Sequence, residues 1–115
     1  IVFSMMDHVH RLCPHSLPPT ARLSGGPARS AIWSQMLCDL LGIPLEILES
    51  TETGALGSAM CAAAAVGAYS DLPTAAKSMN HIQKRYIPNA VRHLIYQNKY
   101  RLYQRAVEAL KVFYR

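Results

Sequence analysis

The sequence has no apolar run close to the roughly 20 residues that a membrane-spanning helix needs. Its most apolar stretch, Ala59 to Val66, is short and rich in alanine. The start shows no secretory pattern. The three cysteines are far apart, and an odd number without a Cys-x-x-Cys pair argues against a disulfide framework. We therefore expect a cytoplasmic protein with reduced thiols and no membrane partner.

Acidic residues are scarce: 7 Asp and Glu stand against 12 Lys and Arg, which gives a formal net charge of +5. Half of the 115 residues are apolar, and this fraction predicts a globular chain rather than a disordered one. The length allows one small domain with a core of its own.

A structural metal pattern is also missing. His8, His10, Cys13 and His15 are close in sequence, but their spacing matches no zinc pattern, and His8 and His10 point to different faces of a helix. We interpret them as surface side chains and predict no metal site.

The chain begins without Met or a helix cap, yet an amphipathic helix is predicted from about Ile1 to Leu12. A chain that starts inside a helix is typical of a piece cut from something longer. We therefore expect a fragment.

A glycine turn is the feature around which the rest is organised. Pro18 and Pro19 precede a short predicted strand, Ala21 to Leu23, which leads into Ser24-Gly25-Gly26. Pro27 is suited to be the first residue of the following helix, predicted from Ala28 to Leu41. Free N–H groups and the helix dipole make such a turn a possible phosphate site. The same pattern also fits an ordinary strand-to-helix connection.

The helix that follows the turn is expected to end at Gly42, and its Asp39 is expected to be structural or exposed. The residues predicted to be buried on this helix are Ile32, Trp33, Met36, Leu37, Leu40 and Leu41.

A second strand-helix unit comes next. Pro44 to Glu49 alternates apolar and acidic residues and predicts a strand with one wet face. The next predicted helix, Gly54 to Val66, is rich in Gly, Ala and Ser, which favours close packing against a sheet or another helix. The alternative is that Gly54 and Gly57 approach a ligand. Two such units predict an α/β layer with parallel strands, too small to bury its own faces and edges.

The last third of the chain is predicted to contain a short helix from Leu72 to Met79, a strand from Ile82 to Ile87 and a long helix from Ala90 to Phe113. The residues predicted to be buried on the long helix are Val91, Leu94, Ile95, Leu102, Ala106, Ala109, Leu110 and Phe113. Its other face mixes tyrosines with Arg92, Lys99, Arg101, Arg105, Lys111 and Arg115. Such a face is either solvated or binds nucleic acid.

Several segments resemble one known family. Four segments are similar to the nucleotide-binding stretch of the FGGY carbohydrate kinases. They are Leu23 to Trp33, Gln35 to Pro44, Glu52 to Ala59 and Gly67 to Tyr69. The Gly-Gly-Pro-Ala run and the helix around Tyr96 to Gln104 resemble in particular the bacterial L-xylulose kinase branch.

The resemblance implies the C-terminal part of the second domain of an actin-like, ribonuclease-H-like kinase fold, with the whole chain, 1–115, inside that domain. It implies ATP and Mg²⁺ as cofactors, with Gly25 and Gly26 over the nucleotide and Ser30 on the adenine side. Pro27 stands where a third glycine is commoner and lacks one N–H donor. Ser30 stands where glycerol kinases have asparagine.

The resemblance also implies what this chain lacks. No catalytic residue is assigned here, because the aspartate base, the Mg²⁺ ligands and the sugar pocket of the family belong upstream of Ile1. The parent would transfer the ATP γ-phosphate to a sugar hydroxyl, with a ketopentose such as L-xylulose expected. The isolated chain is expected to be inactive and to associate with the rest of its parent or with a second copy. Nucleic acid is not an expected partner. The alternative to a kinase fragment is a basic helical module that binds nucleic acid or another protein without catalysis.

Overall fold

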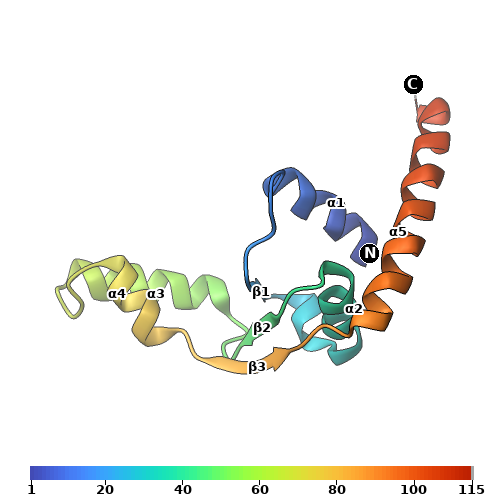
Figure 1. Ribbon diagram of the computed structural model, residues 1–115. Coiled ribbons are helices and arrows are strands. Elements are labelled where there is room, and N and C mark those ends of the chain that lie inside the picture. Colours follow the sequence, from blue (N-terminus) through green and yellow to red (C-terminus); the bar gives the residue numbers. More distant parts are fainter. Residues whose placement is uncertain (115) are drawn as a thin grey trace.

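A small sheet lies at the centre of the computed structural model, which describes residues 1–114, and helices extend from it in two directions (Figure 1). The radius of gyration is 17.4 Å, whereas a compact domain of this length has about 13 Å. In chain order the helices and strands are α1 (Val2–Leu12), β1 (Ala21–Leu23), the 3-10 helix η1 (Gly26–Arg29), α2 (Ala31–Leu41), β2 (Leu45–Leu48), α3 (Thr53–Ala65), α4 (Leu72–Met79), β3 (Ile82–Tyr86), α5 (Ala90–Leu110) and the 3-10 helix η2 (Lys111–Tyr114).

The sheet has the strand order β1-β2-β3. β1 and β2 are parallel and α2 connects them, which confirms the predicted crossover. β3 pairs with β2 in the antiparallel sense. Leu23, Ile47 and Lys84 are aligned across the three strands, so these side chains share one level of the sheet.

The start of α2 differs from the prediction. Pro27 does not begin the α-helix but lies in η1, and Ser30 then adopts an extended conformation with φ −97° and ψ 112°. The Ser30 side chain accepts a hydrogen bond from the N–H of Trp33, so α2 begins only at Ala31. Because the first turn of α2 lies away from the core, Ile32 is 73% exposed and Trp33 is 41% exposed, which corrects their predicted burial.

The core forms where the rest of α2 meets the sheet and the first helix. Leu37, Leu40 and Leu41 of α2 are buried together with residues of the neighbouring elements. The other buried members of this cluster are Val2, Met6, Leu23, Cys38, Leu45, Ile47, Tyr86 and Tyr100. Gly42 ends α2 in a left-handed conformation with φ 71°, as predicted.

Asp39 joins α2 to the start of α5. Its side chain is 1% exposed and accepts hydrogen bonds from the Asn89 N–H at 2.8 Å and from Gln35 at 2.9 Å, and it pairs with Arg92. Its backbone carbonyl also contacts His93 at 2.8 Å. Asp39 is therefore structural, one of the two roles expected for it.

The face of the long helix α5 that packs on the core is the opposite of the predicted face. Its tyrosines lie inward: Tyr100 is 6% exposed, and its ring stacks with Tyr103 and packs at a tilt of 42° against Phe3 of α1. The Tyr100 hydroxyl donates a hydrogen bond to Asp7. Burial and the Asp7 carboxylate raise the pKa of Tyr100 to about 12. The aliphatic face is exposed, so the predicted burial of these residues is wrong for Val91, Leu94, Ile95, Leu102, Ala106, Ala109, Leu110 and Phe113. Arg115 lies outside the described residues.

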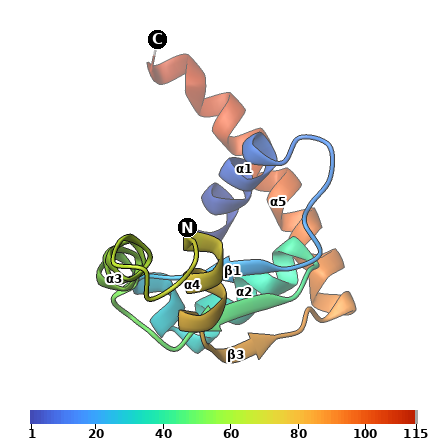
Figure 2. The ribbon, with the colours of Figure 1, turned by 90° about the vertical axis from the view of Figure 1, so that its left-hand side faces the viewer.

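Helices α3 and α4 pack on one another and extend from the sheet as an arm (Figures 1 and 2). Only Met60 of α3 and Ala75 of α4 are buried. The small-residue helix therefore packs on another helix, as predicted, but not through its glycines, because a Cβ added at Gly54 or Gly57 meets no described atom within 4 Å. None of the described helices is both long and apolar enough to cross a membrane.

Candidate functional site

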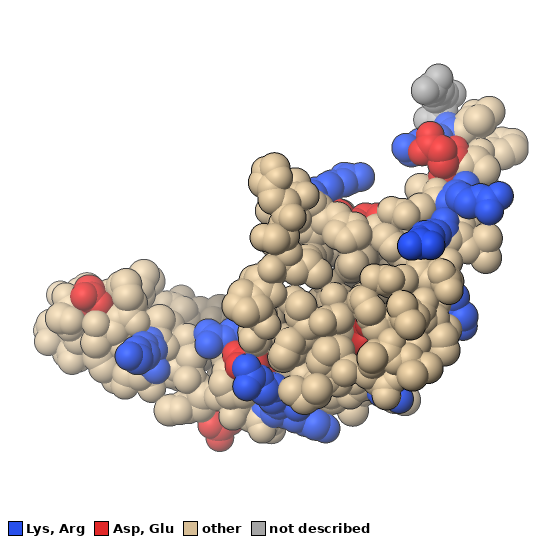
Figure 3. Space-filling model, in the orientation of Figure 1, with Lys and Arg blue, Asp and Glu red and all other residues tan. Residues whose placement is uncertain are grey.

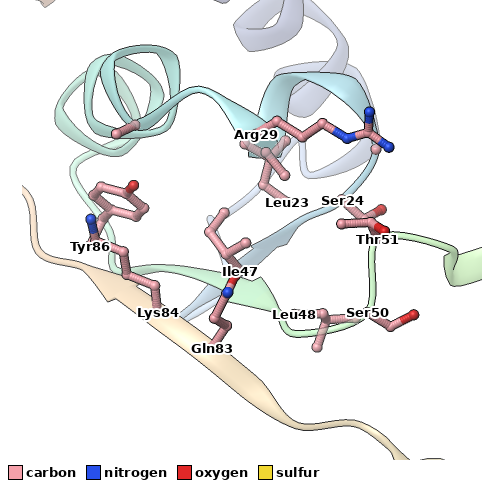
Figure 4. A pocket seen from close by; sticks show the side chains of 13 residues that line it. Leu23, Ser24, Arg29, Ile47, Leu48, Ser50, Thr51, Gln83, Lys84 and Tyr86 are labelled. Atoms are coloured by element: carbon pink, nitrogen blue, oxygen red, sulfur yellow. The ribbon is translucent and has the colours of Figure 1, made fainter.

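A cavity of about 480 Å³ opens at the carboxyl ends of the parallel strands β1 and β2. This end of an open α/β sheet is where such folds bind ligands. Its apolar surface comes from the aligned strands β1 and β2, and its polar groups come from the connections after these two strands and from β3 (Figure 4). The lining residues are Leu23, Ser24, Gly25, Ala28, Arg29, Ala31, Ile47, Leu48, Ser50, Thr51, Gln83, Lys84 and Tyr86.

The glycine turn forms one side of this cavity. Gly25 has φ 79° and ψ −159°, a conformation that is almost restricted to glycine. Its carbonyl accepts a hydrogen bond from the N–H of Ala28 at 3.2 Å, which closes the first turn of η1. A Cβ added at Gly25 or Gly26 meets no atom within 4 Å, so the space beside both residues is open.

The charged groups of the cavity are cations. Arg29 and Lys84 line it, and no Asp or Glu is among its lining residues in the described part of the chain. Arg29 lies 3.9 Å from Glu52, but both side chains are largely exposed, so this contact contributes little. The Lys84 ammonium lies 4.6 Å from the centre of the Tyr86 ring. Ser24, Ser50 and Thr51 add hydroxyl groups, so the cavity is suited to an anionic ligand with an apolar part.

The residues predicted as nucleotide contacts lie at or beside the cavity. Gly25 lines it, and Gly26 and Pro27 follow directly in η1. Ser30 caps α2: its Oγ accepts from the Trp33 N–H at 3.3 Å. Gly54 and Gly57 are in α3, and neither is among the lining residues.

Sequence reasoning missed the cavity residues that lie beyond the turn. Ser50 and Thr51 follow β2, and since the carboxyl ends of parallel strands meet at one edge, their position was a usable signal. Gln83 and Lys84 come from β3, whose pairing with β2 brings together residues far apart in sequence, such as Ile47 and Lys84. No local motif marks Gln83 or Lys84.

Other chemically interesting groups lie elsewhere. Burial opposes ionisation of Asp39, but the hydrogen bonds from Asn89, Arg92 and Gln35 outweigh it and hold the pKa of Asp39 below its ordinary value. Burial raises the pKa of the Cys38 thiol to about 11, so this cysteine is unreactive at neutral pH. Among residues 1–114, no three His, Cys, Asp or Glu side chains gather as a metal site would require.

The basic residues do not form one continuous face in the view of Figure 3, where Lys and Arg lie in separate groups along the sheet edge and α5. On the outer side of the sheet, Arg22 and Arg85 both contact Glu46, at 3.2 and 3.4 Å. These two charges are partly neutralised, which makes this side of the sheet a poor surface for a polyanion.

Comparison with known proteins shows which family the chain matches. Residues 1–66 match the model of the FGGY family of carbohydrate kinases, C-terminal domain. The chain is 36% identical over 115 residues to the L-xylulose/3-keto-L-gulonate kinase of Escherichia coli, covering 99% of this chain and 23% of that protein. It is 38% identical over 114 residues to a probable L-xylulose kinase of Haemophilus influenzae, covering 96% of this chain and 22% of that protein.

A solved structure agrees with the fold. The crystal structure of ligand-bound xylulose kinase from Lactobacillus acidophilus superposes with a TM-score of 0.89 at 24% identity, over 96% of this chain and 23% of that one. The predicted α/β fold class, that of the actin-like sugar kinases, is confirmed. The chain spans less than a quarter of the length of each of these proteins.

Proposed function

Because the chain belongs to the FGGY family of carbohydrate kinases, we propose that it is the C-terminal part of the nucleotide-binding domain of an ATP-dependent carbohydrate kinase. It supplies part of the ATP site. The observation that carries this proposal is the cavity beside the glycine turn, whose lining within residues 1–114 has two cations and no carboxylate.

ATP fits the residues that are present. The open space at Gly25 and Gly26 allows a phosphate group to approach the backbone closely, and Arg29 adds positive charge on the same side of the cavity. Pro27 gives no N–H, so the donors of this turn are its neighbours. Ser30 accepts from Trp33, and its own O–H donates to no group in the described part of the chain, which leaves a donor for the adenine side.

Mg²⁺ does not fit this chain by itself, because its usual carboxylate ligands are missing from the cavity lining of the described residues. The same holds for a base that would accept the proton of the sugar hydroxyl. We propose that both come from a part of the protein outside this chain. The 115 residues alone are then expected to transfer no phosphoryl group.

The sugar is proposed from the relatives. Two of them are named L-xylulose kinases, one as probable, so we propose that a ketopentose hydroxyl receives the ATP γ-phosphate, in the cytoplasm. The nucleic-acid alternative has no comparable support, because the basic residues of α5 accompany an exposed aliphatic face and not a cavity.

A coupled assay for ADP tests this proposal. The full-length protein is expected to release ADP from MgATP only when a ketopentose such as L-xylulose is present, and the 115-residue chain is expected to release none. Sugar-independent ADP release by the full-length protein, or sugar-dependent release by the chain alone, would contradict the proposal.

A further inference from the structure

Of the two cations that line the cavity, Arg29 follows the glycine turn, and Lys84 comes from another part of the sheet. It lies on β3, outside residues 1–66 that the family model matches. Its ammonium rests 4.6 Å from the centre of the Tyr86 ring, and Tyr86 is 8% exposed. The ring attracts a cation over its face, by about 0.5–1 kcal/mol at an exposed site, and so favours this position of the ammonium. Figure 4 shows the Lys84 side chain extending along β3 toward Tyr86.

The position of Lys84 relative to the turn follows from the register. Leu23, Ile47 and Lys84 are aligned across the sheet, and Ser24 and Gly25 follow Leu23 directly. Two strand spacings, about 9–10 Å, therefore separate the backbone at the turn from the backbone at Lys84. The buried side chain of Ile47 lies between them.

This spacing restricts the ligand. A single phosphate ion seated at the turn is too small to reach the other side of the sheet, whereas a nucleotide polyphosphate can extend across it. Lys84 also has no carboxylate partner among the ion pairs of the described residues. A charge held beside a cavity that contains no anion is available to a ligand.

We propose that Lys84 binds a phosphate group of the nucleotide at the far side of the cavity, while Tyr86 favours this position of its ammonium. The cavity is then built for a nucleoside polyphosphate in contact with both edges of the sheet. The inference rests on the proposed ATP site and adds a residue to it. Lys84 is a binding residue here, because no reacting atom is placed beside it.

The test measures nucleotide binding in the full-length protein with Lys84→Gln, Lys84→Arg and, as a matched control, Lys77→Gln on α4. Charge-assisted hydrogen bonds predict that Lys84→Gln weakens ATP binding by about tenfold or more. Lys84→Arg is expected to stay within about threefold of the original protein, because the positive charge remains. The affinity for adenosine, which has no phosphate, is expected to be unchanged in the Lys84 variants, and Lys77→Gln is expected to bind ATP and adenosine like the original protein.

Two results would overturn the inference. One is that the original protein binds ATP and a folded Lys84→Gln variant binds it with the same affinity. The other is an equal loss of ATP and adenosine affinity, which would show that Lys84 supports the cavity and not a phosphate. Failure of the proposed function is distinguishable from both, since the original protein would then bind neither ATP nor adenosine.

Discussion

Substitutions at the two glycines of the turn are expected to have opposite effects on folding and on ATP binding. Gly25 has φ 79° and ψ −159°, which a residue with a Cβ adopts only under strain. Gly26 has no positive φ, and a Cβ added there meets no atom within 4 Å. A side chain at Gly25 therefore disturbs the protein, whereas a side chain at Gly26 disturbs only what occupies the open space.

The magnitudes follow from these geometries. Gly25→Ala is expected to reduce the free energy of unfolding by about 1–3 kcal/mol, the usual cost of a residue in a sparsely populated backbone region. Gly26→Val is expected to change it by about 0.5 kcal/mol or less, like other substitutions that touch nothing. If a phosphate lies against the turn, the valine methyl groups occupy its place. We expect the KM for ATP to rise at least tenfold, which corresponds to about 1.4 kcal/mol.

Denaturant unfolding measures the first quantity, and initial rates at varied ATP and varied sugar measure the second. The KM for the sugar is expected to stay the same in Gly26→Val, and Gly26→Ala is expected to give a smaller rise in the KM for ATP. A folded Gly26→Val variant with an unchanged dependence on ATP would refute the placement of the nucleotide over the turn. A strong loss of stability in the same variant would refute the conclusion that the space beside Gly26 is open.

Asp39→Ala is expected to lower the free energy of unfolding by about 1–3 kcal/mol at neutral pH, because buried donors lose their acceptor. Folding lowers the pKa of Asp39, so its contribution to stability is present above about pH 4 and is lost as the pH falls further. Denaturant unfolding is therefore expected to show a smaller loss of unfolding free energy in the variant at pH 3 than at pH 7. An equal loss at both pH values would contradict this. Reversal of Lys99, Arg101 and Arg105 to glutamate is expected to change stability by about 0.5 kcal/mol or less and to leave the KM for ATP unchanged. Salt-sensitive DNA binding that the reversal abolishes would instead favour a nucleic-acid function. The isolated chain is expected to associate, because the aliphatic face of α5 is exposed, and sedimentation that finds a stable monomer at high concentration would contradict this.

The parts of the fold that the sequence predicted are those with local signals. Gly42 stops α2 because its left-handed conformation suits glycine, and Pro44 follows it. Alternation in the segment after Pro44 predicts β2, whose Leu45 and Ile47 are buried on one face. The start of α2 was misplaced because two rules compete: proline favours the first helical position, whereas Ser30 favours the cap, and the serine determines where α2 begins.

The face of α5 was not predictable by the same means. Tyr96, Tyr100 and Tyr103 recur at helical spacing, as do the aliphatic residues on the other side. The rule that aliphatic side chains are buried selects the wrong face of α5. The groups that α5 meets within the chain are aromatic or polar: Phe3 and Asp7 on α1, and Asp39 on α2. For the cavity, the turn was predicted from its glycines, but Lys84 depended on strand pairing that no short window contains.

The hydrogen bond between Tyr100 and Asp7 joins residues that are 93 positions apart. Closing a loop of this length costs about 4 kcal/mol in its length-dependent part alone. We therefore expect this contact between α1 and α5 to form late in folding, after α1 has packed on α2, which lies much nearer in sequence. Until it forms, Phe3 and Tyr100 lack each other as packing partners. The junction of the two helices is thus the part of the fold that we expect to close last.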